Sequence, residues 1–149
     1  MELLIVLLVL LDQFSKYIAK KYLILKQPIN LINGYLNLIY VENRGAAFGF
    51  FRDKKIILVG FTSIVVIGLI YYLLKNKGKD RFIDFCLILI IAGAIGNLID
   101  RIYLNYVVDF IHFYIKDVFD WPVFNFADIY VSIGAVLLCI KLIFFDKQR

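Results

Sequence analysis

The sequence contains few of the residues on which many enzymes rely. Histidine occurs once in 149 residues, at His112, with no acid four residues away, so neither a HExxH zinc site nor a serine–histidine pair is predicted. Cys86 and Cys139 form no CxxC pattern, and we interpret both as small core residues. A glycine-rich phosphate loop is also missing. We therefore expect no metal and no cofactor.

The chain is instead rich in apolar residues. They make up 62% of it and the mean hydropathy is +0.83, whereas roughly half of a soluble domain is apolar. The net charge of +5 arises mostly beside apolar runs, where Lys and Arg meet lipid headgroups, so nucleic acid is not an expected partner. Four spans of about 20 residues each would use more than half of the chain. We predict one membrane-embedded domain, residues 1–149.

Four apolar runs are long enough to cross a bilayer. Residues 56–74 carry no charge, residues 82–99 and 128–145 carry a few polar groups, and residues 3–22 include Asp12 and Lys16. The first run lacks the basic residues and the cleavage site of a signal peptide, so we expect it to stay in the mature protein. The predicted fold is an all-α membrane protein, a bundle of four transmembrane helices.

The segment between the first two spans favours β-structure. Asn33-Gly34 is a hairpin turn signal, and residues 35–41 are aromatic or β-branched with a partial period of two. We expect a small sheet outside the membrane within residues 30–52. Residues 102–127 are interpreted as a long connection with interfacial aromatic residues. Because basic residues occur in loops on both faces, charge does not decide the orientation.

Charged and polar residues within apolar segments are costly and often functional. Asp12 and Lys16 stand four apart on one helical face, and we favour a neutralised pair that binds the first span to its neighbours. The segment 43–49 joins Asn43 to several small residues and is equally consistent with a turn and a peptide-binding loop.

The run 92–101 combines close packing with polar groups. Ala92 and Gly96 have the small-xxx-small spacing of helices that pack closely. Asn97 shares a helical face with Asp100 and Arg101. A packing seam accounts for the glycines but less well for three polar groups together.

Asp109 and Asp128 each lie among apolar and aromatic neighbours. If the connection between them folds back over the bundle, the two carboxyls meet and share one proton, with one acting as general base for water and the other as general acid. Asp128 would begin the last span, where a helix N-terminus favours an anion. The spacing alone also allows two solvated loop acids.

Five blocks together resemble the bacterial prolipoprotein signal peptidases, also called signal peptidase II. All five occur in order over most of the chain, and the joint match is highly specific although no single block is. Ala92 departs from the pattern, since the family usually has glycine there. The blocks are residues 12–16 (DQFSK), 43–48 (NRGAAF), 93–101 (GAIGNLIDR), 108–110 (VDF) and 124–128 (FNFAD).

The resemblance implies an aspartic endopeptidase that removes the signal peptide from a prolipoprotein by cutting before a diacylglyceryl cysteine. It implies Asp109 and Asp128 as the catalytic acids. It also implies an extracytoplasmic sheet, cytoplasmic termini, and an active site near the outer face of the bacterial inner membrane. We expect a monomer in contact with membrane lipid. The implied substrate-binding or site-supporting residues are Asn43, Gly45, Asn97, Arg101, Asn125, Asp12 and Lys16.

Two other functions are compatible with a small polytopic protein. A transporter or proton-coupled channel would use acids as a relay across the membrane, with Asp12, Lys16, Asp100 and Asp128 as its members. A non-enzymatic assembly factor is the third possibility. The placement of the acids discriminates, because a relay spreads them through the membrane depth and a peptidase gathers two near one face.

Overall fold

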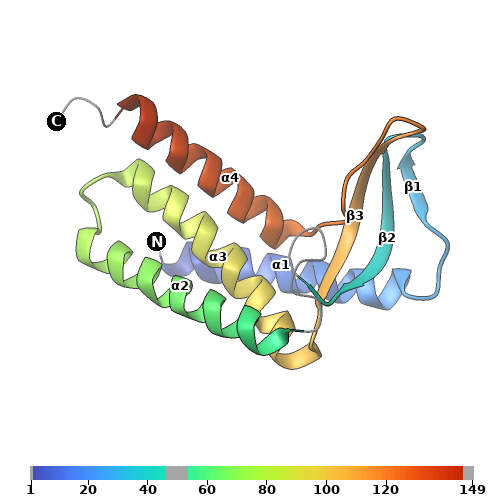
Figure 1. Cartoon of the computed structure of the whole chain (residues 1–149), viewed down its shortest axis with the longest axis horizontal. Helices are drawn as coiled ribbons and strands as arrows, with labels where there is room; N and C mark the ends of the chain where they lie inside the picture. The colour runs from blue at the N-terminus through green and yellow to red at the C-terminus, as the bar shows by residue number, and fades with distance from the viewer. Residues whose placement is uncertain (1, 46–53, 146–149) are drawn as a thin grey trace.

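The computed structural model describes residues 2–45 and 54–145. Its helices form a bundle, and an antiparallel sheet extends from one end of it (Figure 1). The predicted runs at 3–22, 56–74, 82–99 and 128–145 all lie within helices. The helices are α1 (Glu2–Leu23), α2 (Lys55–Asn76), α3 (Arg81–Leu104) and α4 (Phe126–Ile140), which continues as a π-helical stretch, Lys141–Phe145.

Three segments in the described part of the chain are long and apolar enough to cross a bilayer: α2, α3 and Phe126–Phe145. The more highly charged α1 is not among them. Large apolar side chains such as Phe61 on α2 and Val136 on α4 are exposed, as expected for surfaces that face lipid. These helices mark the chain as an integral membrane protein.

The sheet has four strands in the order β1-β2-β3-β4, all antiparallel. The predicted turn at Asn33-Gly34 is confirmed, with Gly34 in the left-handed region at φ 82°. The expectation that the sheet lies within 30–52 is too narrow, because β3 and β4 come from the segment predicted to be a connection. The strands are β1 (Ile29–Ile32), β2 (Leu36–Asn43), β3 (Val107–Ile115) and β4 (Phe119–Asp120).

The strand β3 lacks the simple alternation that reveals a half-buried strand. Its first four residues, Val107 to Phe110, are all buried, because one side contacts α1 and the other side contacts the bundle end. Ala19 and Leu23 of α1 form a core cluster with Val108 and Phe110. This cluster joins the sheet to the helices and thereby fixes where Asp109 lies.

Glycines allow α3 to pack closely against its neighbours, as the small-residue spacing predicts. A Cβ on Gly96 would lie 2.5 Å from Asp12 Oδ2, and one on Gly93 would collide with the carbonyl oxygen of Ala127. On α4, a Cβ on Gly134 would lie 2.7 Å from the Cys86 carbonyl oxygen. The close approach places the start of α4 and the middle of α1 against the same segment of α3.

The two cysteines differ. Cys86 on α3 is fully buried, as predicted, but Cys139 on α4 is exposed, so its assignment to the core is wrong. An apolar sequence does not distinguish a side chain that faces protein from one that faces lipid.

Candidate active site

Asp109 is buried where β3 passes the end of the bundle. It pairs with Val41 of β2, and its side chain is 1% exposed. Asn43 Nδ2 donates to Asp109 Oδ2 at 2.9 Å, and Asn125 Nδ2 donates to Oδ1 at 2.6 Å. Burial, followed by the nearby charge of Asp128, raises the pKa of Asp109 to about 7 despite these amide donors. The carboxyl can therefore hold a proton near neutral pH.

Asp128 lies in the first turn of α4, three residues after the N-cap Asn125. Asn125 Oδ1 accepts from the Asp128 N–H at 3.0 Å, and Asp128 Oδ2 accepts from the Asn125 N–H at 3.2 Å, which forms a capping box. Asn97 Nδ2 donates to Asp128 Oδ1 at 2.8 Å. The side chain is half-buried in the first turn of the helix.

Asparagine amides connect the two acids. Asn125 Nδ2, the donor to Asp109, also lies 3.2 Å from Asn97 Oδ1, and Asn97 in turn donates to Asp128. Both acids line one cleft of about 400 Å³. They line the same cleft because Ile111 of β3 pairs with Phe124, which brings the chain back to the start of α4. Of the two interpretations that the spacing allowed, Asp109 is thus not a solvated loop acid.

The remaining lining of the cleft contains both polar and apolar side chains. Arg101 of α3 lines it and donates from Nη2 to the Gly45 carbonyl oxygen at 3.3 Å. The Gly45 N–H donates to Asn43 Oδ1 at 3.0 Å, so this part of the segment 43–49 forms a turn beside Asp109. Residues 46–49 lie outside the described residues. The apolar lining includes Val107, Trp121, Phe124 and Val131.

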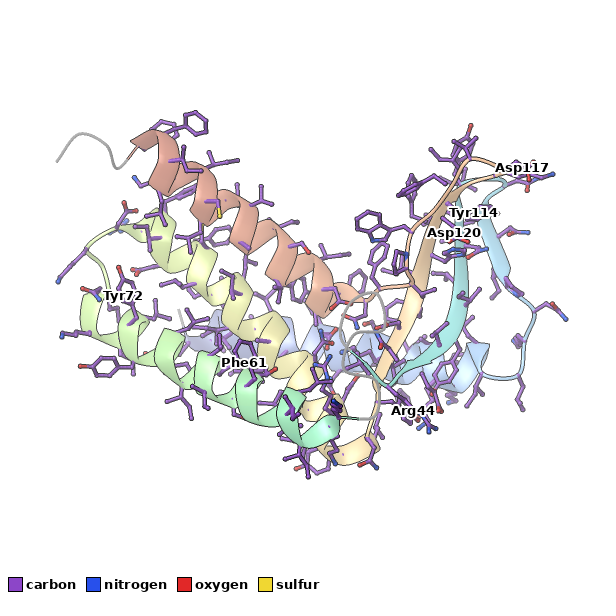
Figure 2. All side chains as sticks on the ribbon, viewed as in Figure 1. Arg44, Phe61, Tyr72, Tyr114, Asp117 and Asp120 are labelled. Carbon is purple, nitrogen blue, oxygen red and sulfur yellow. The ribbon has the colours of Figure 1, made fainter. Side chains whose placement is uncertain are left out.

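His112 lies apart from this cleft. Its two ring nitrogens contact Asn37 Oδ1 at 3.1 Å and Asp120 Oδ1 at 2.6 Å. Figure 2 shows Asp120 on the part of the sheet that projects away from the helices. Within residues 2–45 and 54–145, no group of three or more His, Cys, Asp or Glu side chains is placed to hold a metal ion.

Comparison with known proteins identifies the family. The sequence model described as Signal peptidase (SPase) II matches residues 4–144. The chain belongs to the signal peptidase II family. It is 45% identical to the lipoprotein signal peptidase of Clostridium tetani, with 96% of this chain and 92% of that protein aligned, and 40% identical to that of Fusobacterium nucleatum, with 98% and 87% aligned.

Solved structures of bacterial membrane enzymes have the same fold as this signal peptidase II family member. One is 34% identical with a TM-score of 0.86, covering 94% of this chain and 85% of the other. A second is 34% identical with a TM-score of 0.83, covering 96% and 92%. The family and these neighbours support a membrane protease that cleaves signal peptides from prolipoproteins.

In this signal peptidase II chain, the predicted pairing of Asp12 with Lys16 is confirmed, with 2.9 Å between Lys16 Nζ and Asp12 Oδ2. The expectation was incomplete, however. Lys16 Nζ also lies 3.1 Å from Asp100 Oδ2 and donates to Asn97 Oδ1 at 2.9 Å. The pair is therefore linked, through Asn97, to Asp128.

The sequence prediction omitted two residues of this signal peptidase II network from the site. Asp100 is 2% exposed and contacts Lys16, and Gln13 Nε2 donates to Asp100 Oδ1 at 2.9 Å. Their signals were present: Asp100 follows Asn97 by three residues on α3, and Gln13 adjoins Asp12 on α1. Sequence spacing could not reveal that the two helices turn these faces toward each other.

Proposed function

We propose that this protein is an aspartic endopeptidase that removes signal peptides from prolipoproteins by cleaving before a diacylglyceryl cysteine. Asp109 and Asp128 are its catalytic acids. The observation that carries the proposal is the cleft in which both acids are held by asparagine amides, with the pKa of Asp109 raised to about 7. Two such carboxyls share a proton and so provide a base and an acid together.

In the proposed reaction Asp128, the acid at the helix N-terminus, removes a proton from water as its oxygen attacks the scissile carbonyl carbon. Asp109 donates its proton to the carbonyl oxygen, which yields a tetrahedral diol. The C–N bond then breaks as a proton from the Asp109–Asp128 pair, the catalytic dyad, reaches the leaving nitrogen. The products are a signal peptide with a new carboxylate and a lipoprotein with a free α-amine on its cysteine.

The polar residues around the dyad have supporting roles in this proposal. Asn43, Asn97 and Asn125 orient the carboxyls by donating to them. Arg101 and Gly45 line the path of the substrate backbone, while the apolar wall at Trp121 and Phe124 receives its lipid or apolar side chains. Asp12 and Lys16 support the site from α1.

We also propose that α1 is a fourth span, within a single domain. Its two central charges, Asp12 and Lys16, are 0% and 3% exposed and pair with each other, so they do not meet lipid. The exposed residues of α1 include Leu3, Leu10 and Phe14, which suit a lipid-facing surface. With four spans, both termini lie on the cytoplasmic side of the inner membrane of a monomer, and the sheet and dyad lie at the outer face.

The clustering of acids favours a peptidase over a proton relay. Asp12, Lys16, Asp100 and Asp128, the members of a hypothetical relay, belong to one connected network rather than to a chain that spans the bundle. Such a network supplies no path across the membrane.

The decisive experiment measures cleavage of a diacylglyceryl precursor peptide by purified protein in detergent. Asp109→Asn and Asp128→Asn are each expected to abolish cleavage, because neither variant can share a proton between two carboxyls. Both should retain the fold, since asparagine preserves the size of the side chain and keeps one of its two acceptor oxygens. The matched control is Asp117→Asn at the tip of the sheet, which should cleave normally (Figure 2). Substantial cleavage by either dyad variant would refute the proposal.

A further inference from the structure

Two buried carboxylates outside the dyad bind the backbone directly before it. Asp12 Oδ1 accepts a hydrogen bond from the N–H of Ala127 at 2.9 Å. Asp100 Oδ2 accepts one from the N–H of Val108 at 3.0 Å. Ala127 and Val108 are the residues that immediately precede Asp128 and Asp109. One carboxylate from α1 and one from α3 therefore hold the backbone one residue before each of the two acids, Asp128 and Asp109.

Lys16 joins these two carboxylates. Its Nζ lies 2.9 Å from Asp12 Oδ2 and 3.1 Å from Asp100 Oδ2, and it donates to Asn97 Oδ1 at 2.9 Å. An ammonium group has three N–H donors, so each has an acceptor. The contact with Asn97 also fixes the orientation of that amide, because its oxygen faces Lys16 and its nitrogen consequently faces Asp128.

We propose that Asp12, Lys16 and Asp100 form a clamp that sets the separation of the dyad carboxyls, and that Asp100 is a positioning residue of the reaction. The clamp acts through the peptide N–H groups of Ala127 and Val108. Lys16 holds the two arms of the clamp together. This inference rests on the proposed function, because it assumes that Asp109 and Asp128 are the reacting pair.

Helix packing alone does not account for the arrangement. A buried ion cluster costs desolvation energy, and apolar residues of similar volume are often equally stable in its place. An apolar residue, however, has no side-chain acceptor for a backbone N–H group at a defined position. Both arms of the clamp supply such an acceptor, and both supply it one residue before a dyad acid.

The structure provides a matched control on the same helix. Asp84 of α3 is also almost fully buried, at 3% exposed, and also accepts a backbone hydrogen bond, from the Gly78 N–H at 2.8 Å. It lies sixteen residues before Asp100, at the other end of α3. Removal of either carboxylate leaves one backbone N–H without its acceptor. Of these two carboxylates, however, only that of Asp100 contacts the chain beside the dyad.

The experiment compares Asp100→Ala, Asp100→Asn, Asp84→Ala and Asp84→Asn in full-length protein in detergent. It measures kcat and KM on the diacylglyceryl precursor peptide, and the folded fraction by thermal unfolding. For Asp100→Ala we expect kcat per folded molecule to fall about 10²-fold with KM little changed, since misplacing reacting groups by about 1 Å has that effect. Asp100→Asn keeps an oxygen acceptor for Val108 and should recover part of kcat. Both Asp84 variants should keep the native kcat.

An equal kcat per folded molecule for the Asp100 and Asp84 alanine variants overturns the clamp, and so does a loss that appears only in KM. If Asp100→Ala does not fold, the two asparagine variants decide, because only Asp100→Asn should then have a lowered kcat. Failure of the clamp is distinct from failure of the proposed function, which would appear as activity in Asp109→Asn.

Discussion

The two ends of the bundle contain the same kinds of charged residue in opposite environments. At the end away from the sheet, Asp80 pairs with Lys141 at 3.0 Å and Glu2 pairs with Lys77 at 2.8 Å, all with substantial exposure. At the sheet end, Asp12, Asp100 and Asp109 are almost completely buried. The sheet contributes to this difference, since β3 carries Asp109 against the second end, whereas at the first end Asp84 is buried without a strand over it and the ion pairs stay exposed. Residue type alone therefore does not distinguish a surface ion pair from a reactive acid.

Helix caps offer the strongest way to test this comparison. Asn125 caps α4 beside the dyad, and Asp80 caps α3 at the far end by accepting from the N–H groups of Phe82 and Ile83. Asn125→Ala removes both the cap and a donor to Asp109, and we expect cleavage to fall about 10²-fold with a loss of about 1 kcal/mol of stability. Asp80→Ala should lower the melting temperature and leave kcat unchanged. Equal activity in the two variants would contradict the distinction between the ends.

Close packing of α3 offers a second test with a smaller effect. Gly96→Ala puts a methyl group against Asp12 Oδ2, so the clamp must shift, and we expect a loss of about 1–3 kcal/mol together with reduced cleavage. Gly68→Ala on α2 is the control, because a Cβ there has nothing within 4 Å. It should leave both stability and cleavage near native values. Thermal unfolding and peptide cleavage measure the two outcomes, and a harmless Gly96→Ala would show that α1 and α3 are not tightly apposed.

The third test, with the smallest effect, uses pH. Because the pKa of Asp109 is raised to about 7 in the folded protein, the native state binds its proton more tightly than the unfolded state, and stability decreases as pH rises toward 7. Asp109→Asn should therefore melt at a higher temperature than the native protein at pH 8. Hydrogen bonding to Lys141 and to backbone N–H groups lowers the pKa of Asp80, so Asp80→Asn should melt lower at pH 8.

The pH dependence of the cleavage rate is a second measurement of the ionisation of Asp109. The rate should decrease as pH rises through about 7, where Asp109 loses the proton it donates. A melting temperature that shifts in the same direction for Asp109→Asn and Asp80→Asn at pH 8 would contradict the difference in environment between the two ends.

Helix positions were predictable because apolar runs of this length have few alternatives to a helix in a membrane protein. The turn at Asn33-Gly34 was predictable for a local reason, since glycine adopts the positive φ that the turn requires. The strand β3 was missed because burial on both sides removes the alternation that reveals a strand. The exposure of Cys139 was missed because lipid and protein interiors select the same apolar residues.

The sequence by itself determined the membrane-embedded class, the helix positions, the family blocks and the identity of the two candidate acids. Only the tertiary structure decided that Asp109 and Asp128 line one cleft and that Asp100 and Gln13 join the Asp12–Lys16 pair. The physical reason is the separation along the sequence over which each kind of interaction acts. Helix and turn preferences act over a few residues, whereas these contacts join residues up to 87 positions apart and depend on how α1, α3 and β3 pack together.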